Sequence, residues 1–395
     1  MSDRISRRVL LAGSATAAAA ALAARAGLSA QEPAAPAAPP DPTKVPGMPT
    51  TALGERSPFV KAERAPTGVL SGPSFTPLHQ LTGTITPADL HFERHHGGAA
   101  LVDPQRWKLV IHGMVQRPLT LDLETLKRFP AVTRTHFIEC AGNGRNAYRA
   151  PKPDMTAQQV DGLTANTEWT GVPLATVLRE VGVREKASWF VAEGGDAAVL
   201  SRSIPVAKAM DDALLVWGQN GEPLRVANGY PVRLLLPGWE GNACVKWLRR
   251  LEFVDQPNMS RDETSKYTDP LPGGKARQFS FEMDAKSIIT APTTPSRLAE
   301  PGWWPVSGLA WSGRGRITRV EVSTDGGTSW HEAELLGPAL PKAHVRFQHM
   351  WKWDGRPATL LSRSTDETGY VQPTRETFQR VRGIGTDFHF NYIRA

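Results

Sequence analysis

Dense hydrophobic patterning begins only near Leu101 and then continues to the end of the chain. Together with the residues from 76 onward that precede it, the patterned part of the chain is about 320 residues long. A single hydrophobic core usually supports fewer residues than this. Residues 76–283 mix helix and strand signals, whereas residues 284–395 carry strand signals almost throughout. We therefore predict an α+β protein of two domains, the second of them a small β-sandwich.

The expected elements follow from hydrophobic period and from turn residues. In the first domain we expect strands at 107–113, 132–140 and 232–236, and helices at 123–129 and 172–181. In the second domain we expect strands at 316–322, 344–353 and 358–364, with a turn at 324–328. The sequence contains no heptad pattern and no internal repeat.

Residues 1–30 have the features of an export signal. Ser6-Arg7-Arg8-Val9-Leu10-Leu11 is a twin-arginine start, an Ala-rich run follows from Ala12 to Ala24, and Ser29-Ala30 suits cleavage. The run is shorter than the roughly 20 apolar residues of a membrane span. We predict twin-arginine export to the periplasm and no membrane span after signal removal, the alternative being a frayed N-terminal helix. Residues 31–75, rich in Pro and Ala, predict a linker or surface arm.

Charge and cysteine content narrow the function classes. The formal net charge is +7, and the signal contributes four arginines against one aspartate. The remainder is mildly basic without a Lys/Arg block, which argues against nucleic acid and suits a pocket for small anions. Two cysteines cannot build a disulfide framework, although a single bridge between Cys140 and Cys244 stays open. Cys-x-x-Cys-His does not occur, so we expect no haem in this chain.

The segment Phe137-Ile138-Glu139-Cys140-Ala141-Gly142-Asn143-Gly144-Arg145 carries the strongest chemical signal. Its glycines allow a bulky ligand to approach the backbone, and the arginine favours a thiolate that binds a soft metal. A lone cysteine is more often a buried core residue, but this loop chemistry favours a ligand. One thiolate does not define a zinc or iron–sulfur site, so the other ligands would come from a cofactor.

This loop resembles the cysteine loop of the sulfite oxidase family of molybdopterin enzymes. Six further fragments resemble that family in the same order, so the likeness covers about residues 80–395. They are Phe92–His96 (FERHH), Asn228–Arg233 (NGYPVR), Val245–Leu248 (VKWL), Ser265–Tyr267 (SKY), Ser323–Trp330 (STDGGTSW) and Val381–Gly383 (VRG). Within the family, Leu90–Gly98, Glu139–Arg145 and the missing haem segment most resemble the molybdenum subunit of bacterial Sox sulfane dehydrogenase.

The resemblance implies a molybdopterin-binding domain followed by an immunoglobulin-like β-sandwich dimerisation domain, and hence a homodimer. It implies one molybdenum–molybdopterin per chain, with Cys140 as the metal ligand. The implied cofactor-binding residues are Phe92, Arg94, His96, Asn228, Arg233 and Lys246. Arg94, Arg145 and Arg382 would line an anion pocket, and Tyr267 would assist proton transfer. The implied reaction oxidises carrier-bound sulfane sulfur or sulfite and passes electrons to a cytochrome c.

Three departures from the family pattern leave the substrate open. Asn228 stands where animal sulfite oxidases have histidine, Gly144 replaces a second arginine, and Gln159 falls near the position of their active-site tryptophan. For His91 and His95, spaced four residues apart, we prefer a hydrogen-bonded turn to a metal site, and we expect Cys244 in the core. Two other functions also remain: a sulfoxide-type reductase of the same fold, and a metal-free secreted binding or assembly protein.

Overall fold

The computed structural model describes residues 41–44, 46–294 and 296–394. The predicted export signal and the first ten residues of the predicted linker lie outside the described residues. The described residues before Phe59 form a separate unit that contains one 3-10 turn, η1 (Pro42–Lys44). The described residues from Phe59 onward form one compact unit.

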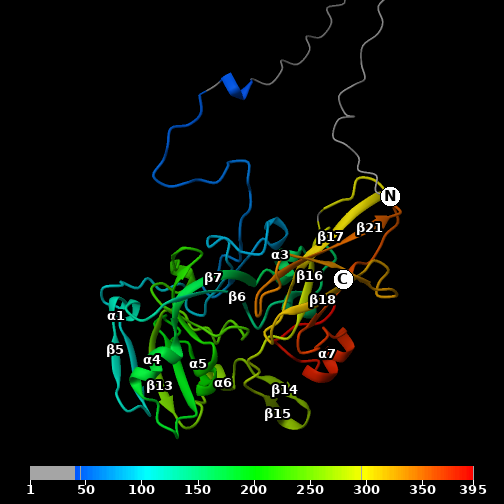
Figure 1. Cartoon of the computed structure of the whole chain (residues 1–395). Helices are drawn as coiled ribbons and strands as arrows, with labels where there is room; N and C mark the ends of the chain where they lie inside the picture. The colour runs from blue at the N-terminus through cyan, green and yellow to red at the C-terminus, as the bar shows by residue number, and fades with distance from the viewer. Residues whose placement is uncertain (1–40, 45, 295, 395) are drawn as a thin grey trace, which may run out of the picture. The chain divides into compact units, whose positions relative to one another are not determined.

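Two five-stranded sheets form the first domain (Figure 1). One has the order β11 (Glu222–Pro223), β10 (Leu214–Gln219), β7 (Thr164–Pro173), β6 (Val132–Glu139), with β12 (Arg233–Leu235) also paired to β10. The other has the order β5 (Leu119–Leu121), β4 (Leu109–Gly113), β13 (Leu248–Val254), β8 (Trp189–Gly194), β9 (Ser201–Pro205). Only the β13–β4 pairing is parallel in these two sheets.

Short helices connect these strands. They are α1 (Leu123–Lys127), α2 (Arg145–Arg149), α3 (Ala157–Asp161), α4 (Leu174–Val181), α5 (Val206–Asp211) and α6 (Arg261–Thr264), with 3-10 turns η2 (Leu78–Gln80), η3 (Val226–Asn228) and η4 (Pro272–Gly274). Asp122 caps α1 by accepting a hydrogen bond from the Thr125 backbone N–H, and Gly182 ends α4 in the left-handed region. The predicted helix at 172–181 begins two residues late, because Val172 and Pro173 complete β7.

The second half of the predicted arm takes part in the fold. β1 (Ala65–Pro66) and β2 (Pro73–Phe75) pair with each other, and β2 pairs with β3 (Glu93–Arg94). Phe75 is buried in the first-domain core. The arm therefore places β3, and the histidine-rich segment that follows it, against the first domain.

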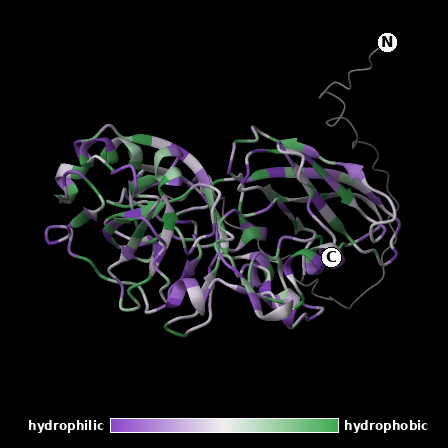
Figure 2. Cartoon of the chain, turned by 90° about the horizontal axis from the view of Figure 1, so that it is seen from below, coloured by the Kyte–Doolittle hydropathy of each residue, from purple (hydrophilic) through white to green (hydrophobic). Residues whose placement is uncertain are grey.

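The second domain is a sandwich of two antiparallel sheets, as predicted. One sheet has the order β16 (Lys286–Ala291), β17 (Gly302–Trp311), β21 (Val345–Trp353), β20 (Glu334–Leu336), and the other β19 (His331–Glu332), β18 (Ile317–Ser323), β22 (Leu361–Asp366). Hydrophobic and hydrophilic residues alternate in bands along its long strands (Figure 2), which is the period of a strand with one buried face. The strand signals did not reveal α7 (Arg375–Arg382), which follows the sandwich.

The two domains share a core. Leu78, Phe137 and Met283 of the first domain pack with Ile288, Leu309 and Trp311 of the second. A two-stranded ribbon, β14 (Asp269–Leu271) and β15 (Lys275–Arg277), lies in the chain between the domains. The predicted α+β class, with a mixed first domain and a sandwich second domain, is confirmed.

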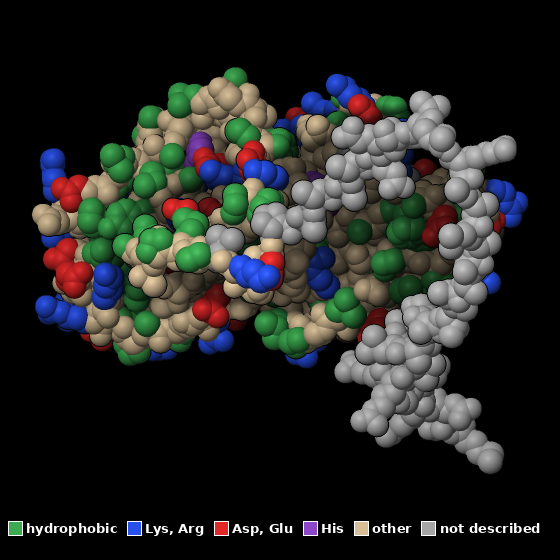
Figure 3. All heavy atoms as spheres, turned by 90° about the horizontal axis from the view of Figure 1, so that it is seen from above, with side chains coloured by type: hydrophobic (Ala, Val, Ile, Leu, Met, Phe, Trp, Pro, Cys, Tyr) green, Lys and Arg blue, Asp and Glu red, His purple; other side chains and the backbone are tan. Residues whose placement is uncertain are grey.

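On the face shown in Figure 3, Lys and Arg side chains lie among Asp and Glu side chains and do not gather into one patch. Within the described part of the chain, no helix is long and apolar enough to cross a membrane.

Candidate active site

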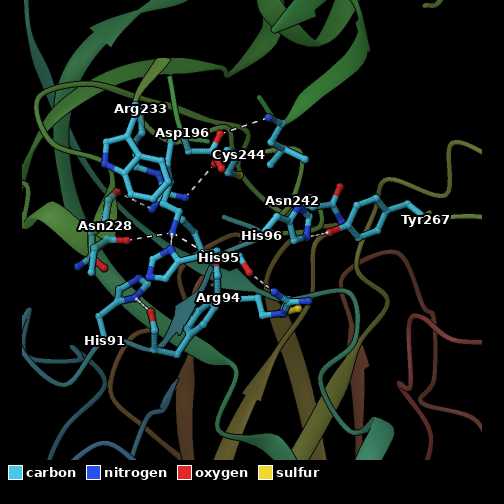
Figure 4. Close-up of a pocket in the computed structure, with 18 residues that line it drawn as sticks. His91, Arg94, His95, His96, Asp196, Asn228, Arg233, Asn242, Cys244 and Tyr267 are labelled. Atoms are coloured by element: carbon cyan, nitrogen blue, oxygen red, sulfur yellow. Dashed lines mark hydrogen bonds between the residues drawn. The ribbon is translucent and has the colours of Figure 1, made fainter. Parts of the chain in front are cut away.

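A cavity in the first domain gathers most of the predicted site residues (Figure 4). The space between its lining side chains, part of it open to solvent, is about 680 Å³. Its walls come from the segment around β3, the end of β6, the loop after β8, β12 with the loops on either side of it, and the segment between α6 and β14. Eight predicted residues line it: Phe92, Arg94, His96, Cys140, Asn228, Arg233, Lys246 and Tyr267.

Cys140 stands directly after β6, where the strand gives way to a tight loop. Its backbone N–H donates to the Leu163 carbonyl (2.9 Å), and its own carbonyl accepts from the Asn143 N–H (2.9 Å). Gly144, with φ of +92°, begins α2 in a conformation that favours glycine. A Cβ on Gly142 would lie 2.9 Å from Nη2 of Arg145, so a glycine there lets this arginine fold back over the loop.

The Cys140 thiol lines the cavity and forms no disulfide. Burial raises the pKa of this thiol, and the charges of Arg94 and Arg145 oppose the effect without overcoming it. The arginine after the loop therefore lowers the pKa of the thiol, as predicted, but desolvation is larger and the net shift is upward. A bound cation at the sulfur would reverse the balance, since metal coordination deprotonates a thiol.

Lys246 is a buried lysine that lines the cavity. Nζ of Lys246 donates to the carbonyls of Ala227 (2.9 Å) and Arg94 (3.2 Å) and lies 2.6 Å from Nδ1 of His95. Burial lowers the pKa of this lysine well below its ordinary value. Gly229, with φ of +106°, lets the backbone approach so closely that a Cβ would lie 3.0 Å from the lysine Cβ.

Arg233 of β12 is also buried at the cavity wall. Its Nη1 donates to the Asn228 carbonyl (3.1 Å) and its Nη2 to the Cys244 carbonyl (3.0 Å). Burial lowers the pKa of Arg233 to about 10. Its Nε has no partner among the described residues, and neither has Nε2 of His91. Nε of Arg233 is a donor, whereas Nε2 of His91 is an acceptor, because Nδ1 of this neutral histidine donates to the Phe92 carbonyl. Buried polar atoms usually have a partner, so this donor and this acceptor suit a polar ligand such as a pterin.

Three other side chains that line the cavity with Cys140 are cationic or can carry a proton. Arg94 donates through Nη1 to the Ser71 carbonyl (2.7 Å). The hydroxyl of Tyr267 lies 2.9 Å from Nε2 of His96, and this contact is drawn in Figure 4. Burial, and then Arg94, lower the pKa of His96, while burial raises that of Tyr267. Both groups are therefore neutral near pH 7, and the Tyr267 hydroxyl can donate its hydrogen bond to the unprotonated Nε2 of His96.

Two predicted residues do not line the cavity. Arg145 turns away, and its Nε (3.1 Å) and Nη2 (2.7 Å) donate to the Asp387 carbonyl. Arg382 of α7 pairs with Asp284 (3.0 Å) and lines a different cavity between the domains. Folding the cysteine loop against the C-terminal residues satisfies Arg145 there, and the Asp284 carboxylate holds Arg382 apart from Cys140.

The cavity also contains residues that the sequence analysis did not name. Asp196 follows Gly194-Gly195 at the end of β8, and Asn242 follows Gly241 in the turn before the Val-Lys-Trp-Leu fragment. Both are polar residues after glycines at a strand end or turn, and this signal could have identified them. Trp247 lies within the quoted fragment and adopts a positive φ of 49°.

The alternative metal site at the histidines has no support. His91 bonds the Phe92 carbonyl (2.9 Å), whereas His95 bonds Glu93 (2.9 Å). Among the described residues, no group of three His, Cys, Asp or Glu side chains is placed to hold a metal ion. Cys244 is buried in the core, as expected, although one side of it reaches the cavity.

Comparisons with known proteins agree with this geometry. The family described as "Oxidoreductase molybdopterin binding domain" matches residues 96–262, and "Mo-co oxidoreductase dimerisation domain" matches residues 277–394. Sulfite oxidase of Gallus gallus is 31% identical over 313 residues, which cover 73% of this chain and 68% of that protein. The chain belongs to the sulfite oxidase family of molybdopterin enzymes.

The chain is also similar to three further proteins. It is similar to the crystal structure of the sulfane dehydrogenase SoxCD from Paracoccus pantotrophus, with a TM-score of 0.82 and 44% identity, covering 90% of this chain and 96% of that one. Mitochondrial sulfite oxidase of Rattus norvegicus is 31% identical, and nitrate reductase [NADH] 2 of Phaseolus vulgaris is 32% identical. The chain spans 59% of the former and 35% of the latter.

Proposed function

We propose that this chain is the molybdenum subunit of a sulfur-oxidising dehydrogenase. It oxidises sulfane sulfur held on a carrier cysteine, or sulfite, and passes the electrons to a cytochrome c. One observation carries the proposal: a thiol, a guanidinium and a Tyr–His hydrogen bond, from Cys140, Arg94, Tyr267 and His96, border one cavity. The likeness to a protein titled sulfane dehydrogenase supports the choice of substrate class.

The residues present fit a molybdenum–molybdopterin group. Cys140 would be its protein ligand to the metal, and Asn228, Arg233, Lys246 and His96 would hold the pterin and its phosphate, with Phe92 beside them. The unpartnered Nε of Arg233 supports this fit, because it is a buried donor on a residue that lines the cavity and would need a polar partner. The bound group would supply the two-electron oxidation of sulfur, for which water is the oxygen source.

The chain's own residues bind the anion and handle protons. Oxidation of sulfite takes in one water and releases two protons and two electrons. Arg94 attracts the sulfur oxyanion, because a guanidinium presents paired donors to its oxygens. The neutral His96 Nε2 accepts a proton through the Tyr267 hydroxyl, 2.9 Å away.

The proposal includes assembly and location. Residues 1–30 direct twin-arginine export to the periplasm, and a separate cytochrome c takes up the electrons. Residues 277–394, matched as a dimerisation domain, form a homodimer. A sulfur-carrier protein presents the persulfide when sulfane sulfur is the substrate.

Steady-state assays on purified protein from a host that makes the cofactor test the proposal. We expect a dye acceptor to be reduced with sulfite or with a persulfidated carrier, and no turnover of methionine sulfoxide with a reduced dye. Sulfoxide reduction without sulfur oxidation would favour a reductase. Turnover with none of these substrates, in protein that lacks molybdenum, would favour a binding or assembly protein.

A further inference from the structure

Arg202 is a buried arginine that the sequence analysis did not single out. It lies in β9, and its side chain is 1% exposed. Its guanidinium carbon is 4.8 Å from the ring centroid of Tyr267 and 6.0 Å from that of Phe281. A guanidinium within about 6 Å of a ring centroid is attracted to it, more strongly when water is excluded. Arg202 therefore contacts the tyrosine whose hydroxyl reaches the cavity.

Two buried carboxylates fix this guanidinium. Its Nε donates to Oε1 of Glu263 (3.1 Å) and its Nη2 to Oε1 of Glu240 (3.1 Å). The Glu263 oxygen also accepts the Ser203 backbone N–H (2.6 Å), which ties it to β9. Glu240 comes directly before Gly241, which lines the cavity. The plane of the guanidinium is thus held from two separate segments.

A contribution to stability does not readily explain why Arg202, Glu240 and Glu263 are buried together. One buried arginine with two buried glutamates must be taken out of water, and apolar residues of similar volume often serve a core as well or better. Nη1 of Arg202 has no partner among the described residues, so the desolvation is not fully offset. The contact of Arg202 with Tyr267 suggests that these three residues have a role other than packing.

The orientation of the Tyr267 side chain depends on the residues that contact its ring. It has a φ of +50°, which is uncommon for a residue other than glycine. Besides Arg202, its ring contacts Phe388, with 5.2 Å between centroids. These contacts set the tilt of the ring and hence the 2.9 Å approach of its hydroxyl to His96.

We propose that Arg202, fixed by Glu240 and Glu263, is a positioning residue that holds the Tyr267 hydroxyl toward His96 and the cavity. The proposal rests on the proposed function, because Tyr267 handles a proton only if this cavity oxidises sulfur. Misplacing a reacting group by about 1 Å can lower the rate about a hundredfold. The loss therefore falls on kcat more than on KM.

Arg202→Met alone leaves two buried carboxylates unpaired and threatens folding. The test variant is therefore Arg202→Met/Glu240→Gln/Glu263→Gln, in which the whole group is neutral. Arg202→Lys is the partial-rescue variant, because it keeps the charge but loses the flat contact with the ring. All are compared as cofactor-loaded proteins with equal metal content.

Arg363 supplies a matched control in the second domain. Its guanidinium carbon lies 4.3 Å from the Trp330 ring centroid, and its Nε donates to Glu321 (2.8 Å). Arg363→Met removes the same kinds of contact as the test variant, far along the chain from the cavity. We expect it to leave both kcat and the Tyr267 signal unchanged.

Two readouts are taken: kcat and KM for sulfite with a dye acceptor, and the ¹⁹F NMR signal of 3-fluorotyrosine placed at position 267. We expect kcat of the neutral variant to fall about tenfold to a hundredfold, with KM within about twofold. In a Tyr267→Phe background the three neutral substitutions should cause no further loss, because Arg202 acts through that tyrosine. The ¹⁹F signal should shift or broaden in the neutral variant, and less so in Arg202→Lys.

An unchanged ¹⁹F signal in the neutral variant, or losses that multiply with Tyr267→Phe, would overturn the positioning role. The two proposals fail differently. If the wild-type protein oxidises no sulfur compound, the proposed function is wrong, and the ¹⁹F comparison still reports whether Arg202 orients the ring. If sulfur oxidation is intact and the ¹⁹F signal does not move, only the positioning role is wrong.

Discussion

Lys286, the first residue of β16, donates a 2.9 Å hydrogen bond to Oε1 of Glu139, the residue directly before Cys140. Both side chains are fully buried. Nζ of Lys286 also lies 2.9 Å from Asp161, and Nε1 of Trp311 donates to the other oxygen of Glu139 (2.7 Å). The second domain therefore does more than flank the first, because its residues fix the strand end that carries the cysteine.

The first prediction concerns this buried ion pair. Lys286→Met leaves Glu139 and Asp161 without their shared cation, and we expect the free energy of unfolding to fall by about 3–5 kcal/mol. Chemical denaturation measures the change. Lys352→Met, at an exposed position of β21, should change it by less than about 0.5 kcal/mol. Equal effects of the two substitutions would show that the interdomain pair does not stabilise the fold.

A second prediction concerns acid stability. Burial would raise the pKa of Asp161, but Arg394 and Lys286 overcome it and hold the pKa below 3.8. Because the folded pKa is below the unfolded one, the carboxylate stabilises the fold above pH 3.8, and this contribution is lost as pH falls through the lowered value.

Asp161→Asn should therefore lower stability at pH 7, by about 3 kcal/mol, and flatten the acid limb of a plot of unfolding free energy against pH. The exposed Asp154→Asn is the control and should keep the wild-type slope. An acid limb as steep in Asp161→Asn as in the wild type would contradict the assignment.

The third prediction separates backbone strain from crowding at the cavity. Gly221 and Gly229 both have positive φ, but a Cβ on Gly221 would meet nothing within 4 Å, whereas one on Gly229 would press on Lys246. Gly221→Ala should cost about 1 kcal/mol from the backbone alone. Gly229→Ala should cost at least about 1 kcal/mol more and reduce pterin content. Thermal unfolding and pterin analysis check this, and equal costs for the two would refute the crowding.

A fourth prediction concerns the anion. Arg94→Gln removes a cavity guanidinium, so KM for sulfite should rise by about tenfold or more. The exposed Arg106→Gln should leave KM within about twofold. Initial rates over a range of sulfite concentrations give both values. A KM in Arg94→Gln equal to that of the wild type would remove this residue from the substrate site.

Much of the fold could be predicted from the period of the hydrophobic residues and from the glycines and prolines that end helices and strands. The strand before Cys140 and the helix that ends at Gly182 were visible because hydrophobic spacing and a terminal glycine agree there. Helix α7 was not visible, because its eight residues contain five charged or amide side chains and bury little besides Phe378.

The residues of the site likewise fall into those that could be predicted from the sequence and those that could not. Fragments with unusual local chemistry, such as the loop after Cys140, could be assigned from sequence because their residues act close to their own backbone. Arg382 could not be placed, because its position depends on Asp284, about a hundred residues earlier. Arg202 could not be identified from the sequence, because its partners, Glu240 and Glu263, come close to it only in the folded chain.

The central claim is that the sulfur of Cys140 binds molybdenum. X-ray absorption at the molybdenum edge counts the sulfur atoms around the metal, and Cys244→Ser is the matched control because its thiol also borders the cavity. We expect Cys140→Ser to show one sulfur neighbour fewer than the wild type or to lose the metal, while Cys244→Ser shows the wild-type spectrum. An unchanged sulfur count at full metal content in Cys140→Ser would contradict the account.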